Sequence, residues 1–176
     1  MVTLPNKYVF RRAYSELNLL DITPQKFQNG ECYNFITSGD VDAISFIKLI
    51  IRQQNIEYLL FSTWCMALDD CKQFEKWLQD GKIKKLDAYF GEIFKGSYRR
   101  EYNEMKRIFE TYKCGRIGIF RNHSKVFAGY GDKFHFGIQT SANINTNPRT
   151  ENACIQINKE IFEFYKSYFD EIKSFE

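Results

Sequence analysis

Hydrophobic and polar positions in the first half of the chain predict alternating strands and helices. Residues 32–37 alternate loosely between apolar and polar side chains, which is typical of a strand. A turn and helix cap at 38–40 follow, and apolar residues then recur at helical spacing over 41–51. The nearly continuous apolar run 58–64 predicts a central strand that is buried on both faces. We expect this strand, helix, strand unit to form a right-handed parallel crossover.

The pattern over the rest of the chain completes a mixed sheet. Helices are expected at 68–79 and 98–112, with a strand at 83–90 between them. The pattern then changes to strands with short gaps, which we expect at 117–120, 123–130, 134–140 and 153–158. Residues 159–175 have the apolar stripe of an amphipathic closing helix. The predicted fold class is α/β, with a mixed β-sheet flanked by helices on both faces.

The N-terminal stretch fits this pattern least. Residues 1–30 mix polar and aromatic positions, are interrupted by Pro5 and Pro24, and show no clear periodicity. We therefore predict an irregular N-terminal arm over 1–30, with at most one strand, and a single domain over 31–176. A chain of 176 residues is long enough for one domain with a sizeable core.

Composition and charge narrow the class of protein. The net charge of +3 permits a polyanionic partner without requiring one. No apolar stretch reaches the roughly 18 to 20 residues that a transmembrane helix needs, so we expect a soluble protein that does not bind membranes. Five scattered cysteines and the lack of a signal-like N-terminal run favour reduced thiols in the cytoplasm. Neither histidine lies near cysteines at zinc spacing, so a structural metal is not expected.

The candidate chemistry lies between residues 123 and 151. If His123 and Lys125 share one strand, their side chains point the same way. An imidazole with a pKa of about 6.5 can attack phosphorus or protonate a leaving oxygen near neutral pH. Lys125 would neutralise a phosphate oxygen, and Ser141 and Asn143 would donate hydrogen bonds to the same group. The stretch is therefore suited to phosphodiester chemistry.

Two acids are candidates for orienting the histidine. Glu151 and Asp132 each could accept a hydrogen bond from the second ring nitrogen and fix the tautomer. Asp132 also lies in a turn-rich stretch, where it would instead cap the local backbone. Arg149 would hold Glu151, bind phosphate or be a solvated loop residue. His135 has no comparable neighbours and is expected to be structural.

The order of these residues resembles the signature of the phospholipase D superfamily. In that family an HxK pair, an acid and a GSxN segment recur, and here the corresponding residues are His123-x-Lys125 and Ser141-x-Asn143. The run 147–152 also resembles the tail of the motif in small nuclease-like members. The resemblance is strong over the last third of the chain and implies a phospholipase D-like fold.

The chain departs from the family pattern around the acid and the serine. The family places an aspartate five residues after the lysine, where this chain has Tyr130, whereas Asp132 lies seven residues after Lys125. Thr140 replaces the glycine before the serine, so the backbone cannot approach a phosphate as freely. A longer hairpin around Gly129, Gly131 and Asp132 would account for the extra residues.

The resemblance implies a homodimer and a covalent mechanism. Family members with one motif per chain pair two chains to build one active site, and this chain has one copy of the motif. Two His123 side chains would then flank one phosphate across a twofold axis. One would attack to form a phosphohistidine, and the other would protonate the leaving oxygen. This scheme requires no cofactor and no metal.

Our main hypothesis is therefore an enzyme, a metal-independent phosphodiesterase that cleaves DNA or RNA as an endonuclease. Candidate substrate contacts are cations that bind phosphate and rings that stack on bases. They are Trp64, Tyr98, Arg99, Arg100 and Thr140. Core packing of Trp64 and a solvated basic cluster at 98–100 are the alternatives.

Two other functions stay open at this point. The departures from the family pattern allow a catalytically degenerate module that binds nucleic acid or supports an assembly on the same fold. A lipid phosphodiesterase or phosphatidyl transferase would use the same chemistry. The chain offers neither a second motif nor a clear membrane-binding apolar helix for that third function.

Overall fold

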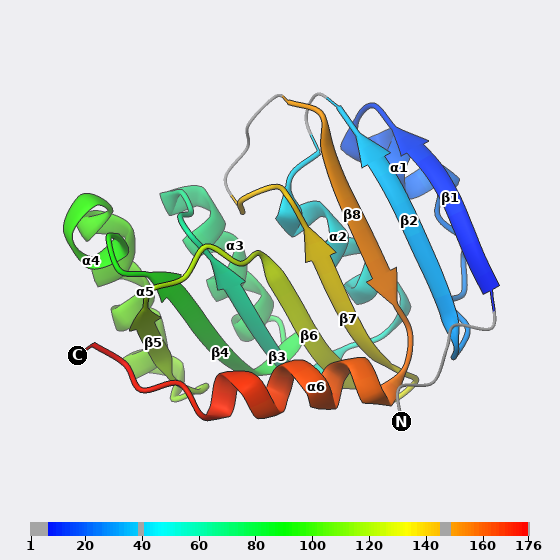
Figure 1. The fold of residues 1–176 in the computed structure, drawn as a ribbon. Coiled ribbons are helices and arrows are strands. Elements are labelled where there is room, and N and C mark those ends of the chain that lie inside the picture. Colours follow the sequence, from blue (N-terminus) through cyan, green and yellow to red (C-terminus); the bar gives the residue numbers. More distant parts are fainter. Residues whose placement is uncertain (1–6, 39–40, 145–148, 176) are drawn as a thin grey trace.

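One mixed β-sheet runs through the described part of the chain (Figure 1). The computed structural model describes residues 7–38, 41–144 and 149–175. Within these ranges the sheet has eight strands in the order β1-β2-β8-β7-β6-β3-β4-β5. The strands are β1 (Lys7–Ala13), β2 (Glu31–Thr37), β3 (Ile56–Thr63), β4 (Ile83–Gly91), β5 (Ile117–Phe120), β6 (Val126–Gly131), β7 (His135–Thr140) and β8 (Glu151–Gln156).

The strands are parallel at the two ends of the sheet and antiparallel in the middle. β1 pairs with β2 in parallel, and so do β3 with β4 and β4 with β5. β6, β7 and β8 form an antiparallel series that joins β3 on one side and β2 on the other. The predicted α/β mixed sheet is confirmed.

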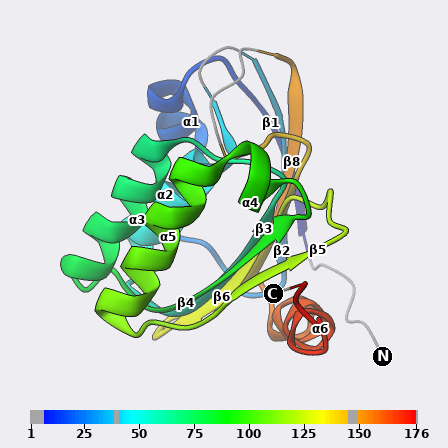
Figure 2. The same cartoon turned by 90° about the vertical axis from the view of Figure 1, so that its left-hand side faces the viewer.

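Helices cover both faces of the sheet, but unequally. The helices labelled α1 to α5 lie on one face and α6 lies on the other, as the edge-on view shows (Figure 2). The helices are α1 (Glu16–Ile22), α2 (Ala43–Gln53), α3 (Leu68–Gln79), α4 (Phe94–Ser97), α5 (Arg99–Tyr112) and α6 (Lys159–Asp170). None of the helices in these ranges is long and apolar enough to cross a membrane.

The core consists of two apolar layers, one on each face of the sheet. Leu59 and Phe61 of β3 pack into the larger layer beneath the five helices, and the Phe61 ring stacks on Phe74 of α3 at 4.7 Å. Tyr58 and Leu60 point to the other face and pack with α6. Burial on both faces explains why the sequence of β3 is nearly continuously apolar.

The face that carries α6 is only half covered. α6 packs against β6 and β7, and its apolar layer continues over β3, β4 and β5. The outer faces of β8, β2 and β1 carry no helix (Figure 1). Phe10 on β1 is accordingly 71% exposed, and Ile36 on β2 is 51% exposed.

The N-terminal stretch is ordered structure rather than the irregular arm that the sequence predicts. β1 pairs with β2 from Lys7↔Glu31 to Ala13↔Thr37, and α1 follows it. Residues 1–6 lie outside the described ranges. The prediction fails because β1 is a half-exposed edge strand and α1 is short, with only Leu19 fully buried, so neither shows clear periodicity.

Several predicted boundaries also shift. β6 begins at Val126, three residues after His123, so neither His123 nor Lys125 lies on a strand. Gly129 belongs to β6 and not to the hairpin turn. Its backbone lies so close to β3 that a methyl group there would lie 2.5 Å from the Tyr58 carbonyl oxygen. The predicted cap of α2 at 38–40 lies partly outside the described residues. The N-cap is Asp42, whose carboxylate accepts from the Ser45 amide at 3.2 Å.

Candidate active site

Four strand ends bring most of the predicted site residues to one edge of the sheet (Figure 1). β3 ends at Thr63 and β7 ends at Thr140, whereas β6 begins at Val126 and β8 begins at Glu151. Because β6 is antiparallel to both β3 and β7, and β7 to β8, these four ends share one edge. The loops that carry His123 and Ser141 start or finish there.

Lys125 folds back onto His123 in the loop before β6. Its Nζ atom lies 3.1 Å from Nδ1 of His123 and donates to the His123 carbonyl oxygen at 3.0 Å. An ammonium group can only donate, so Nδ1 accepts and the neutral ring carries its hydrogen on Nε2. The two side chains share a surface, as predicted, but through this contact and not through strand register.

A buried polar network fixes the loop on both sides of His123. The Asn122 side-chain amide donates to Ser62 Oγ of β3 at 2.8 Å, and its oxygen accepts from the Ser124 amide at 3.0 Å. The hydroxyls of Ser62 and Ser124 lie 2.7 Å apart. Sequence reasoning missed this network. Its signals are a serine within the apolar run of β3 and the Asn-x-Ser pair that flanks His123.

Trp64 extends the site where β3 ends. Its ring centroid lies 5.5 Å from that of His123, with the planes inclined by 45°. Gly91, at the end of β4, makes room for the indole. A methyl group on Gly91 would lie 2.6 Å from Cδ1 of Trp64 and 2.9 Å from the Asn122 carbonyl oxygen. The structure therefore places Trp64 beside the candidate histidine.

The loop between β7 and β8 supplies the second half of the motif. Ser141 Oγ donates to the Glu151 carboxylate and accepts from the Asn152 amide at 3.0 Å. Thr140 Oγ1 donates to the Asn152 carbonyl oxygen at 2.9 Å, so its side chain supports this loop. Glu151 is thus held by Ser141. The described contacts of Glu151 include none with the His123 ring that it was predicted to orient.

Electrostatics connects the two halves of the motif. Partial burial lowers the pKa of Lys125 below its ordinary value, while the nearby Cys65 and Glu151 act in the opposite direction. Burial also raises the pKa of the Cys65 thiol, which shares a hydrogen bond with the Tyr98 hydroxyl. Lys125 therefore lies within electrostatic range of the carboxylate that Ser141 holds.

Asn143 has an unsatisfied oxygen next to these groups in the sequence. Its Oδ1 atom is buried and has no hydrogen-bond partner among the described residues. Its carbonyl oxygen accepts from the Ala43 amide at the start of α2, at 3.3 Å. A buried polar atom without a partner costs roughly 1 to 3 kcal/mol. No donor among the described residues reaches this atom.

Three solved structures share this arrangement of strands and helices. Polyphosphate kinase from Porphyromonas gingivalis matches 78% of this chain and 25% of its own, with a TM-score of 0.55 and 10% identity. Phosphatidylserine synthase from Haemophilus influenzae Rd KW20 matches 80% of this chain and 37% of its own, with a TM-score of 0.53 and 11% identity. TrmBL2, an archaeal chromatin protein, matches 89% of this chain and 56% of its own, with a TM-score of 0.52 and 11% identity. The fold is phospholipase D-like.

The phospholipase D-like fold was the expectation from the sequence resemblance, and these matches confirm it. The chain spans between a quarter and just over half of the length of the structures it matches. Its sequence matches no family model and no curated protein. At 10 to 11% identity the likeness extends to the fold and not to activity.

Within this phospholipase D-like fold, Asp132 lies at the wrong edge of the sheet to orient His123. It follows Gly131, which pairs with Ile56 at the beginning of β3, whereas His123 precedes Val126, which pairs with Ser62 near its end. The six residues of β6 separate the two edges by about 17 Å, at roughly 3.3 Å per residue. Of the two roles considered for Asp132, that of orienting the histidine of its own chain is therefore contradicted, and that of a turn residue is left. The extra residues lengthen the hairpin away from the site.

Among the described residues, none of the contacts of the His123 ring is with one of the remaining candidates. Tyr98 reaches Cys65 behind Trp64, while Arg99 and Arg100 are exposed where α5 begins. Arg149 is exposed just before β8, and residues 147–148 of the motif tail lie outside the described ranges. His135 packs against the ring of Tyr130 at 5.2 Å, as a structural histidine would.

Metal ligands do not cluster in the described part of the chain. No group of three or more His, Cys, Asp or Glu side chains there is arranged to hold a metal ion.

Proposed function

We propose that this protein is a phosphodiesterase that acts on nucleic acid, an endonuclease that needs no metal ion. One observation carries the proposal. His123 and Lys125 are in direct contact at an exposed sheet edge, with Trp64 on one side and the Ser141–Glu151 pair within electrostatic range of the lysine. These groups supply a nucleophile or acid, a cation for a phosphate oxygen and an aromatic wall.

The contact between Lys125 and His123 suggests how the histidine is activated. With Nδ1 occupied, the ring is neutral and has its hydrogen on Nε2. Once Lys125 turns away and Nδ1 takes up a proton, the resulting imidazolium can protonate a leaving oxygen from Nε2 and end as a neutral ring. A phosphate would draw the ammonium away from Nδ1. The ring hydrogen could then move to Nδ1, which leaves the Nε2 lone pair free to attack phosphorus.

A homodimer would supply the two forms at once. The chain carries one copy of the motif, and a twofold axis through this edge would place a second His123 across the phosphate. One ring attacks to form a phosphohistidine and its mate protonates the leaving oxygen. Water then attacks phosphorus and gives its proton to the mate, which is neutral after the first step, and the phosphorus–nitrogen bond breaks to release the product and restore both rings.

Plasmid and single-stranded DNA in EDTA test the proposal. The protein and His135→Gln, a matched control at the structural histidine, should cleave at similar rates. His123→Gln should lose at least 100-fold in rate, because general acid or base catalysis alone contributes about that much. A denaturing quench should also trap acid-labile phosphate on residue 123. Equal cleavage by His123→Gln and the unmodified protein would discard the proposal.

A second candidate is a module that binds nucleic acid without cleaving it. Among the described contacts, the only polar side-chain partner of the His123 ring is Lys125, so no carboxylate of the described residues fixes the tautomer. The chain also shares its fold with TrmBL2, whose structure is described as showing a novel mode of DNA binding.

This second function predicts binding without turnover. DNA affinity should be unchanged in His123→Gln, and neither DNA, RNA nor phospholipid vesicles should be hydrolysed by the unmodified protein. Phospholipid hydrolysis that His123→Gln abolishes would instead support a lipid phosphodiesterase.

A further inference from the structure

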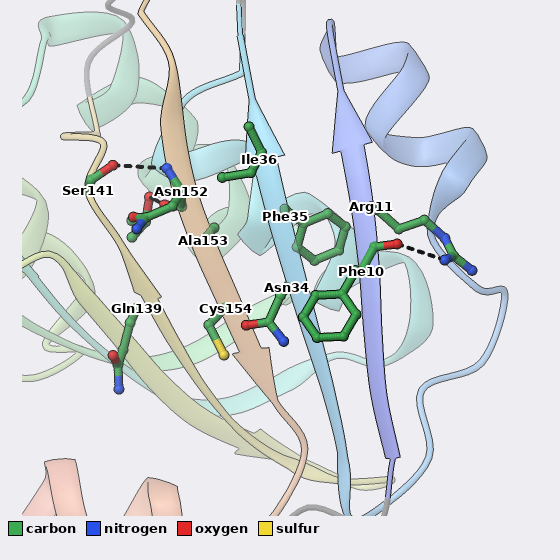
Figure 3. Close-up of a pocket in the computed structure, with 11 residues that line it drawn as sticks. Phe10, Arg11, Asn34, Phe35, Ile36, Gln139, Ser141, Asn152, Ala153 and Cys154 are labelled. Atoms are coloured by element: carbon green, nitrogen blue, oxygen red, sulfur yellow. Dashed lines mark hydrogen bonds between the residues drawn. The ribbon is translucent and has the colours of Figure 1, made fainter.

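A groove leads away from the candidate site across the uncovered half of the sheet (Figure 3). It begins at Ser141, crosses β8 and β2 and reaches Phe10 on β1, and it encloses a cavity of about 760 Å³. It lies on the face that α6 leaves open. The groove thus connects the loop of Ser141 with the open surface of β8, β2 and β1, which takes no part in the proposed reaction.

Strand register explains how the floor of the groove is built. Phe10, Asn34, Cys154 and Gln139 are successive partners across β1, β2, β8 and β7. Directly paired residues lie on the same face of a sheet, so these side chains form one row. Three strand spacings of roughly 4.8 Å make the row about 14 Å long, which is the length of only a few nucleotides.

The groove combines a free aromatic ring with amide groups. Phe10 is 71% exposed and has no aromatic neighbour among the described ring pairs. Asn34, Gln139 and Asn152 present side-chain amides, which can donate to and accept from the edges of bases. Such a surface suits a flat ligand with polar edges.

The charge of the groove suits an anion. None of the described residues that line it is acidic, the one carboxylate at its inner end being that of Glu151, which Ser141 holds, and Arg11 lies at its outer rim (Figure 3). Among the described residues the Arg11 guanidinium donates only to backbone carbonyl oxygens, of Ile22 at 3.3 Å and Phe10 at 2.9 Å, and it pairs with no carboxylate there. Lys125 provides a second cation near the other end.

We propose that this groove binds single-stranded nucleic acid, with a base stacked on Phe10 and the strand leading to Ser141 and Lys125. The inference rests on the proposed function and names its substrate class. Stacking on a side chain requires an unpaired base, and open sheet faces with exposed aromatics are used in this way by RNA-binding domains. The exposed apolar side chains, Phe10 and Ile36, are few and interspersed with amides, unlike the apolar centre of a dimer interface.

Fluorescence anisotropy with labelled oligonucleotides tests the groove. The series is made in full-length His123→Gln, so that binding is measured without turnover, with oligo(dT) as the single strand and a hairpin of equal length as the duplex. The single strand should bind at least tenfold more tightly. Adding Phe10→Ala should weaken single-strand binding about tenfold, because that is the usual effect of removing a stacking ring, and Phe10→Trp should restore it.

Phe175→Ala is the matched control, because this phenylalanine is 63% exposed near the opposite end of the sheet, where its amide donates to Ile119 of β5. It should bind the single strand like its parent. Equal binding by Phe10→Ala and Phe175→Ala, or a preference for the duplex, would overturn the proposal. So would a dimer that sediments as a monomer after Phe10→Ala while its DNA affinity is retained. Failure of nuclease activity is scored separately, by cleavage in EDTA, and does not affect these measurements.

Discussion

The two halves of the sheet differ in what covers them. β3, β4 and β6 are packed between helices on both faces, whereas β1, β2 and β8 have helices on one face and an open surface on the other. The candidate site lies where these halves meet. The closed half holds His123 through Ser62 and Asn122, and the border strands supply Ser141 and Glu151.

The difference teaches which part of the molecule provides precision and which provides access. A reacting group must be held to within a fraction of an ångström, which a strand buried on both faces can do. A ligand as long as a nucleic acid needs an open surface, which such a strand cannot provide. We therefore expect substitutions in the closed half to affect folding and turnover, and those in the open half to affect substrate binding.

The largest expected effect is on the free energy of unfolding, and it comes from comparing a buried position with one on the open face. Phe61→Ala removes a ring with no exposed surface that contacts Phe74, Phe90 and Phe127, and should lower the free energy of unfolding by about 3 to 5 kcal/mol. Ile36→Ala on the open face should change it by less than about 0.5 kcal/mol. Urea unfolding measures both values, and similar losses would show that the open face is covered in solution.

An intermediate effect separates turnover from binding. Asn122→Ala removes the side chain that joins the His123 loop to β3, and we expect kcat to fall roughly 10- to 100-fold with KM nearly unchanged. Asn34→Ala on the groove floor should raise KM for single-stranded substrate and leave kcat nearly unchanged. Steady-state kinetics on a labelled oligonucleotide measures both constants. The same change in both variants would contradict the division of roles.

The fold could be predicted from the sequence where burial follows a simple period. β3 is nearly continuously apolar because both of its faces are buried, and α3 begins and ends at the predicted residues. The edge of the sheet gave no such pattern, because one face of β1 is exposed and α1 buries a single leucine. The uneven cover by α6 depends on where that helix docks, and periodicity within one helix contains no information about docking.

The site was predictable to the extent that its residues flank strand ends. His123, Lys125, Ser141 and Glu151 converge because antiparallel strands bring their loops together. The position of Asp132 was not predictable from spacing alone, since it depends on how far β6 runs: Tyr130 already pairs with Tyr58 near the beginning of β3, and Asp132 follows the end of β6. The Ser62–Asn122–Ser124 network was missed because it joins positions 60 residues apart.

The smallest expected effect concerns stability: a partly buried carboxyl group on α3, in the closed half, lowers the free energy of unfolding. Asp70 caps α3 by accepting from the Ala67 amide at 2.7 Å. Burial, with additional repulsion from Asp42 and Asp69, raises the pKa of Asp70 to about 6, against the opposing influence of this hydrogen bond and of Lys48. The folded state therefore binds a proton more tightly than the unfolded state. This group destabilises the fold as pH rises from about 4 to 6.

Asp70→Asn should remove that cost and retain an oxygen that can cap the helix. Because the carboxyl is partly exposed, we expect a gain in unfolding free energy of only about 1 kcal/mol at pH 7 and almost none at pH 4. Urea titrations at both pH values measure the difference. Asp69→Asn is the matched control: its carboxylate pairs with Lys72 at 2.8 Å, which lowers the pKa of Asp69, so its loss should not stabilise the protein. A gain at pH 7 that persists at pH 4 would show that it does not come from burial of the charge.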